Sequence, residues 1–335
     1  MSTKQFNRLF AGVARCTLPL LIASVLLPAS AHASNAYTVN SNAYVANEND
    51  NTVSVIDTST NAVTAMVTVG TSPAGIAVSP NGATVYVANL SSNSISVINA
   101  ATNAVTTSVP VGSGPTAAVV SPNGADVYVA NSDANSVSVI DTASNTVVAT
   151  VPVGNDPASV AVTPDGAHVY VANTSDNTVS VIDTASNAVS ATISVGVNPV
   201  SVAAGPFGYR MYVANVGDNT VSVINTANNA VIETTAAGNG TDAVAVSPIG
   251  VPAYAANLVD NTVSVINPLN GAVVRSVTVG GAPDSIAISG RSLGVYVANA
   301  NDNTVSVINP LTNRVIATVN VGAVPVAVAT QPVHL

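Results

Sequence analysis

The chain has 335 residues and a mass of 33.0 kDa, with 7% charged residues and 48% hydrophobic ones. So few charges exclude a coiled coil, and so much apolar content excludes a disordered chain. The formal net charge is −9; three of the seven basic residues lie in the first fifteen positions, whereas every acidic residue lies after position 47. An acidic surface repels phosphate backbones, so we expect no nucleic acid partner.

The first 33 residues have the pattern of a signal peptide. Lys4, Arg8 and Arg15 form a positive head, an apolar stretch spans 18–27, and Ala31-His32-Ala33 is a small-x-small cleavage site. This pattern predicts cleavage after residue 33. The alternative is an uncleaved membrane anchor, which the shortness of the apolar stretch disfavours.

The only cysteine, Cys16, lies inside this segment. The mature chain therefore has neither a disulfide nor a thiolate ligand. We expect a secreted or periplasmic protein with no transmembrane segment in the mature chain, and attachment to the cell surface remains open.

A 42-residue repeat occurs seven times along the rest of the chain. The repeated tyrosines are Tyr44, Tyr86, Tyr128, Tyr170, Tyr212, Tyr254 and Tyr296. An asparagine follows each tyrosine by three positions and another by seven, as in Asn89 and Asn93, and a glycine such as Gly112 keeps the same period. The repeats predict one domain over 41–335, preceded by a short arm over 34–40.

Each repeat contains four short apolar segments separated by turn residues. In the repeat over 73–112 we expect strands at 76–78, 85–88, 95–98 and 105–111. We call them A, B, C and D in chain order. Pro110 falls within a D strand and cannot donate a ladder hydrogen bond, which predicts that D lies at the outer edge of its sheet.

Four-stranded units at this period predict an all-β fold, a seven-bladed β-propeller of antiparallel blades. An open solenoid or a β-helix would not account for four strands per repeat. The repeat phase places the segment from Pro325 on an A strand, whereas the N-terminal segments over 42–46, 53–56 and 63–69 correspond to B, C and D. We therefore predict that the C-terminal strand completes the N-terminal blade. Residues 36–40 are a rival for that place, and we expect them to be displaced.

The segment Tyr170-Val171-Ala172-Asn173, followed by Asp176-Asn177-Thr178-Val179-Ser180-Val181-Ile182-Asp183-Thr184, resembles the YVTN family of β-propeller repeats. The resemblance extends over 41–334, with Ala where the family name has Thr. It implies a secreted, periplasmic or cell-surface propeller, and it carries no catalytic residue over to this chain.

Residues present in every repeat are expected to be structural. The tyrosines should lie between blades with the hydroxyl bonded to a partner. The paired asparagines should cap the turn between B and C. The glycines should supply a positive φ before strand A.

Function is expected where the repeats differ, near the loops between D and A at the channel mouth. Four polar residues come from consecutive blades there: Asp156, Asn198, Asp242 and Asp284. Oxygen ligands of this kind suit Ca²⁺ or Mg²⁺. The alternative interpretation is a solvated acidic rim.

On the opposite face, Asp126, His168 and Arg210 occupy equivalent positions in three successive blades. We interpret them as a polar recognition patch or as solvated surface, because equivalent positions on neighbouring blades are too far apart for a catalytic triad. Phe207, in the A–B turn nearby, is either a contact point or a local packing residue. The residues predict no catalytic constellation.

These observations favour a binding or surface scaffold, expected to be monomeric, that presents its loops to a protein or glycan partner in the periplasm or at the cell surface. The alternative is a divalent-cation-dependent lactonase-like or lyase-like enzyme, with the cation held by Asp156, Asp242 and Asp284. A third interpretation, an accessory to periplasmic quinone-cofactor enzymes, depends on family analogy alone.

Overall fold

The computed structural model describes residues 41–290 and 294–332. The predicted signal peptide and the predicted arm over 34–40 lie outside these residues. No helix among the described residues is long and apolar enough to cross a membrane.

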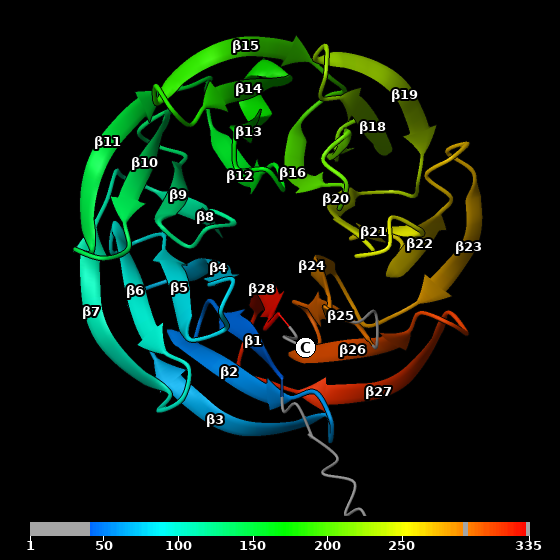
Figure 1. The fold of residues 1–335 in the computed structure, drawn as a ribbon. Helices are drawn as coiled ribbons and strands as arrows, with labels where there is room; N and C mark the ends of the chain where they lie inside the picture. Colours follow the sequence, from blue (N-terminus) through cyan, green and yellow to red (C-terminus); the bar gives the residue numbers. More distant parts are fainter. Residues whose placement is uncertain (1–40, 291–293, 333–335) are drawn as a thin grey trace, which may run out of the picture. The chain divides into compact units, whose positions relative to one another are not determined.

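Seven four-stranded antiparallel sheets are arranged around a common axis, as the repeat predicts (Figure 1). The innermost A strands are β4 (Pro73–Val78), β8 (Pro115–Val120), β12 (Pro157–Val162), β16 (Pro199–Ala204), β20 (Thr241–Val246), β24 (Pro283–Ile288) and β28 (Pro325–Thr330). The B strands are β1 (Asn42–Asn47), β5 (Thr84–Asn89), β9 (Asp126–Asn131), β13 (His168–Asn173), β17 (Arg210–Asn215), β21 (Ala253–Asn257) and β25 (Val295–Asn299). The C strands are β2 (Thr52–Asp57), β6 (Ser94–Asn99), β10 (Ser136–Asp141), β14 (Thr178–Asp183), β18 (Thr220–Asn225), β22 (Thr262–Ile266) and β26 (Thr304–Asn309). The outer D strands are β3 (Ala62–Thr68), β7 (Ala104–Pro110), β11 (Thr146–Pro152), β15 (Ala188–Ser194), β19 (Ala230–Ala236), β23 (Val273–Thr278) and β27 (Arg314–Asn320).

The hydrophobic core lies between neighbouring blades. Strands B and C are rich in β-branched residues and are buried on both faces, whereas strand D is mostly exposed. One core cluster joins Tyr86 and Ile95 of one blade to Val127 and Ile140 of the next. Burial against two neighbours explains the high hydrophobic content of the chain. The prolines of β7 and β11 lie on edge strands, as predicted.

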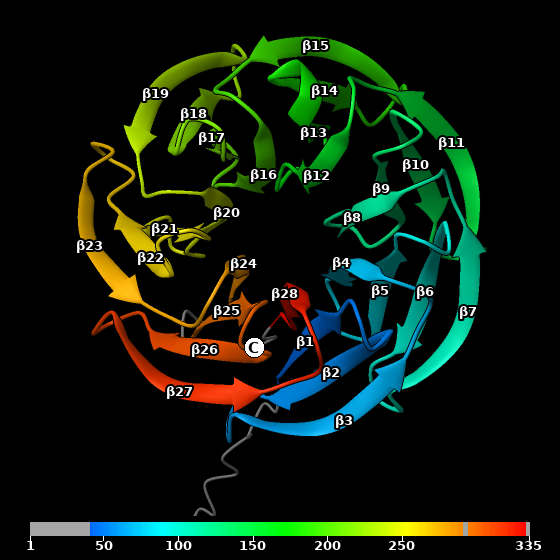
Figure 2. The ribbon, with the colours of Figure 1, turned by 180° about the vertical axis from the view of Figure 1, so that it is seen from behind.

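The ring closes as the repeat phase predicts. Strand β28 pairs with β1, with Val328 opposite Val45, and completes the sheet β28-β1-β2-β3 (Figure 2). The Gln331 side chain accepts a hydrogen bond from the Asn42 backbone at 2.8 Å and donates one to the Gly82 carbonyl at 2.7 Å. Gln331, which follows β28, therefore also contacts the next blade.

The predicted role of the repeated glycines is wrong. None of Gly70, Gly112 and their equivalents has a positive φ; asparagines in the turns, such as Asn93 and Asn103, adopt that conformation instead. A Cβ on Gly112 would lie 2.7 Å from Cγ of the buried Asn131. The glycine is required because the asparagine side chain occupies the space beside it.

The two repeated asparagines have different roles. The first, exemplified by Asn131, is buried, and its Nδ2 donates to Ser136 and Ser138 of the C strand at 3.3 and 3.0 Å. The second, exemplified by Asn135, accepts a hydrogen bond from the Asp156 backbone at 2.9 Å and so ties the B–C turn to the loop entering the next blade.

The repeated tyrosines lie between blades, as predicted. The Tyr170 hydroxyl donates to Asn229 Oδ1 of the next blade at 2.7 Å. Tyr254 makes the equivalent bond to Asn313 at 3.4 Å. The buried hydroxyl of Tyr44 has no such partner.

Candidate functional site

The loops from each D strand to the next A strand lie beside the B–C turns, and backbone hydrogen bonds join them, such as the 2.7 Å bond from Ser132 N to Gly114 O. We call this side of the ring the D–A face, and the side with the A–B and C–D turns the A–B face. The A strands surround the axis (Figures 1 and 2). A residue near the start of an A strand therefore lies near the axis at the D–A face.

The second residue of each A strand lies at a β-bulge. In β20, Thr241 and Ala243 pair with consecutive residues of β21, so Asp242 is the extra residue; in β24, Asp284 is the extra residue in the same way. A bulge leaves its extra residue unpaired and redirects its side chain. Both aspartates are partly exposed. The bulges thus present two carboxyl groups from adjacent blades.

Asp242 and Asp284 share a hydrogen bond. Burial raises the pKa of Asp242 to about 6, although the hydrogen bond from Asp284 opposes the rise. Burial also raises the pKa of Asp284 to about 8, and the charge on Asp242, the hydrogen bond to Asp242 and the charge on Glu48 add to the rise. Near neutral pH the pair therefore holds one proton between its two carboxyl groups.

Apolar and small residues occupy the equivalent positions of the other blades. They are Ala74, Thr116, Ala158, Val200 and Val326. No positively charged group of the described residues contributes to the pKa shift of either aspartate. The negative charge of Glu48 adds to the rise in the pKa of Asp284. Burial without a nearby positive charge explains why the pKa values of both carboxyl groups lie above the ordinary value of aspartate.

Neighbouring side chains hold the backbone of the pair in place. Thr241, which stands where the other A strands begin with Pro, donates to Gly238 O at 2.8 Å and to Asn257 Oδ1 at 3.2 Å. Ser285, next to Asp284, accepts from Val328 N of the following A strand at 3.1 Å. The aspartates are therefore mounted on strands that are tied to their neighbours.

Asp156 and Asn198 do not join this pair. Both lie in D–A loops with a positive φ, and Asp156 is exposed. The Asp156 carboxylate accepts a 3.4 Å hydrogen bond from Ser175, whereas Asn198 donates to Thr174 O at 3.3 Å. Each lies in the D–A loop of its blade, two positions before the residue at the bulge.

The described residues do not assemble the ligand set that was expected for a divalent cation. Among residues 41–290 and 294–332 no group of three or more His, Cys, Asp or Glu side chains is close enough to hold a metal ion. The expected set of Asp156, Asp242 and Asp284 is therefore not assembled. A bound Ca²⁺ or Mg²⁺ would require more oxygen ligands than this pair offers.

The residues of the predicted patch on the A–B face come from equivalent positions of three blades. Asp126, His168 and Arg210 are the first residues of β9, β13 and β17, and each faces the C strand of its own blade. Arg210 donates to the Pro268 carbonyl of the next blade. Burial, together with the charge of Asp141, raises the pKa of Asp126. These contacts lie within and between blades, and a role of the three residues in recognition stays a prediction.

Phe207 is 66% exposed on the same face. A Cβ built on Gly250 would lie 2.9 Å from its ring, so the side chain also contacts the neighbouring A–B turn. Both interpretations of Phe207 therefore stay open.

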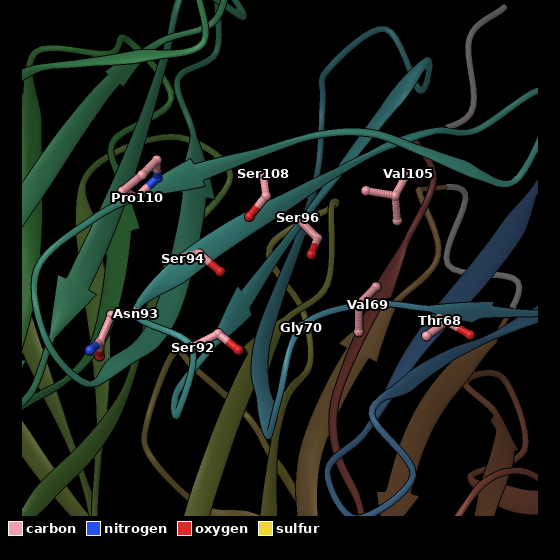
Figure 3. A pocket seen from close by; sticks show the side chains of 10 residues that line it. All are labelled: Thr68, Val69, Gly70, Ser92, Asn93, Ser94, Ser96, Val105, Ser108 and Pro110. Atoms are coloured by element: carbon pink, nitrogen blue, oxygen red, sulfur yellow. The ribbon is translucent and has the colours of Figure 1, made fainter.

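Two pockets lie away from the carboxyl pair. One, of about 550 Å³, is lined mainly by serines of β6 and β7 and by the end of β3, with no charged side chain (Figure 3). The other, of about 470 Å³ on the A–B face, includes Asp126 and Asp165. Asp165 is hydrogen-bonded to Thr163, which lowers its pKa. Neither pocket contains a pair of carboxyl groups that share a proton.

Two family models match parts of the chain. Residues 32–148 match the model described as "Lactonase, 7-bladed beta-propeller", and residues 107–209 match a YNCE-like beta-propeller. Each covers about a third of the chain, and neither carries the YVTN name. No curated protein matches.

Solved structures agree with the fold. Hydrazine synthase of Kuenenia stuttgartiensis is 23% identical with a TM-score of 0.71, over 76% of this chain and 88% of that one. Two candidate 6-phosphogluconolactonases are also similar, each with a TM-score of 0.74 over 99% of its own length. The one from Bacteroides uniformis is 18% identical over 87% of this chain, and the one from Bacteroides fragilis is 16% identical over 88%.

The expectation of a binding scaffold without catalytic activity is contradicted by the lactonase model, which favours the enzyme alternative. The chain is a seven-bladed β-propeller, similar over residues 32–148 to the lactonase propellers.

Proposed function

We propose that the protein is a lactonase-like hydrolase whose active site lies at the D–A face, around Asp242 and Asp284. The observation that carries the proposal is the hydrogen-bonded carboxyl pair with raised pKa values, in a chain with partial similarity to the lactonase propellers. Pairs of titratable groups whose environments separate their pKa values are typical of acid–base catalysis.

The two groups have complementary roles in opening a lactone ring. The Asp242 carboxylate accepts a proton from water while the water oxygen bonds to the lactone carbonyl carbon. The resulting tetrahedral intermediate breaks the bond between that carbon and the ring oxygen, and Asp284 gives its proton to the departing oxygen. Transfer of a proton from Asp242 to Asp284 across their hydrogen bond then restores the pair.

Covalent catalysis by another side chain has less support. The only histidine among the described residues, His168, lies on the A–B face, and the chain beyond Cys16 has no cysteine. Among the described residues, a serine nucleophile at the D–A face would therefore lack a histidine base. Direct attack by water, activated by a carboxylate, requires only groups that lie there.

The test is lactone turnover by the purified protein and two isosteric variants, Asp242→Asn and Asp284→Asn. Each variant should lower kcat/KM by about 10²- to 10⁴-fold, the usual contribution of one general acid or base. The matched control is Asp156→Asn, which neutralises a carboxylate at the same end of the ring but outside the pair, and it should retain activity.

The pH dependence provides a second criterion. With pKa values of about 6 and about 8, activity needs ionised Asp242 and protonated Asp284, so kcat/KM should follow a bell with its maximum near pH 7. Equal activity of the wild type and both pair variants would refute the roles assigned here. Absence of turnover across uncharged and phosphorylated lactones would refute the proposed function.

A further inference from the structure

Carboxylates gather on the D–A face around the pair. In five of the seven blades an aspartate of the B–C turn accepts a hydrogen bond of 2.6–2.8 Å from the backbone N–H of a D–A loop. These residues are Asp50, Asp176, Asp218, Asp260 and Asp302. The bond from Asn155 N lowers the pKa of Asp176. A B–C turn also carries Glu48, which raises the pKa of Asp284 through its charge.

Positive charge lies elsewhere on the described part of the ring. Arg210 begins β17 at the A–B face, Arg275 lies within the outer strand β23, and Arg314 begins the outer strand β27. Among residues 41–290 and 294–332 no Lys or Arg belongs to a D–A loop, a B–C turn or an A strand. A phosphate at this face would meet carboxylates without a cation to pair with.

The usual alternative for binding phosphate, a helix N-terminus, is also missing from the described residues, whose one helix is the 3-10 turn Thr174–Asp176. Asp176 itself adds a negative charge there. Neither side chains nor backbone dipoles on this face are therefore arranged for an anion.

The positions level with the pair carry no charge other than that of the pair itself. Ala74, Ala158, Val200 and Val326 stand where Asp242 and Asp284 stand in their own blades, and Thr116 is the one further polar residue. The Thr116 hydroxyl already donates to Pro157 O at 3.0 Å. The equivalent positions of the other blades therefore offer no cation to a substrate at the pair.

From these charges we infer that the site accepts uncharged lactones and excludes phosphorylated ones. This inference depends on the proposed function and narrows its substrate class. It separates this chain from the candidate 6-phosphogluconolactonases with a similar fold, whose name implies a phosphorylated substrate.

The test compares glucono-δ-lactone with its 6-phosphate, because the two share the same ring and reacting carbonyl and differ in the phosphate. The uncharged lactone should have a kcat/KM at least about 100-fold higher, within the range by which surface fields change encounter rates. Any turnover of the phosphorylated lactone should increase when NaCl screens the face, whereas turnover of the uncharged lactone should not change.

A rim variant, Asp176→Asn with Asp218→Asn and Asp260→Asn, keeps an oxygen that can accept each loop N–H but removes three charges. It should raise kcat/KM for the phosphorylated lactone at least about 10-fold and leave that for the uncharged lactone within about 2-fold. If the variant does not fold, the salt dependence of the wild type provides the same test.

The outcomes separate the two claims. Comparable turnover of both lactones, or a faster reaction with the phosphorylated one, would overturn the inference and leave the proposed function standing. Turnover of neither lactone would overturn the proposed function and the inference with it.

Discussion

The carboxyl pair should make the protein less stable as the pH rises, and Asp284→Asn should remove much of that loss. An acid whose pKa is raised by folding binds its proton more tightly in the native state than in the unfolded state. Its contribution is therefore fully present below the ordinary pKa of 3.8 and is lost as the pH passes the folded value, about 8 for Asp284. The window of the loss is from about pH 4 to about pH 8.

The size of the effect follows from the shift. One pKa unit corresponds to about 1.4 kcal/mol, so a rise from 3.8 to about 8 sets an upper bound of about 6 kcal/mol. Asp284 is partly exposed, and solvent screening reduces this figure to about 3 kcal/mol. For a ring of about 290 residues, with an unfolding entropy of about 2 cal/mol/K per residue, that is about 5 °C in Tm.

The assay is thermal unfolding between pH 4 and pH 9, followed by circular dichroism, for the wild type, Asp284→Asn and the control Asp156→Asn. Groups outside the pair are the same in the wild type and in Asp284→Asn, so the difference in slope between these two proteins isolates the pair. The Tm of Asp284→Asn should fall about 5 °C less than that of the wild type. Parallel curves for these two proteins would refute the raised pKa and the shared proton.

Two predictions concern the ring itself. Removing residues 325–335 should lower Tm sharply and promote aggregation, because it deletes β28 and exposes the edge of β1, whereas removing 34–40 should change Tm little; the opposite result in calorimetry would show that the N-terminal segment completes the blade. Gly112→Ala should lower the free energy of unfolding in urea by about 1–3 kcal/mol, because its Cβ would lie 2.7 Å from Asn131 Cγ. Gly124→Ala should lower it by about 1 kcal/mol, because only the positive φ is strained there. A larger loss for Gly124→Ala would contradict the steric explanation.

The blade architecture could be derived from the sequence because the determinants are local and repeated. Strand lengths, turn residues and the 42-residue period identify four strands per blade, and the prolines of the D strands identify the outer edge. The closure followed from the same arithmetic, since Pro325 falls in the phase of the A strands. Because these features recur in each repeat, one atypical blade does not prevent their recognition.

The role of the repeated glycines could not be derived in this way. A glycine is compatible both with a positive φ and with close contact to a side chain, and the two cases look the same in a sequence. The contact between Gly112 and Asn131 crosses from a D–A loop to the buried end of a B strand. Only the tertiary structure shows which requirement applies.

Part of the candidate site could be predicted from the sequence. Repeat alignment selected Asp242 and Asp284 as charged exceptions at one end of the ring, but it grouped them with Asp156 as oxygen ligands for a cation. The bulges aim the side chains of only the first two, and burial leaves them sharing a proton. Sequence determined which residues break the symmetry of the blades, whereas tertiary structure decided their protonation, because desolvation and the distance between two blades are properties of the closed ring.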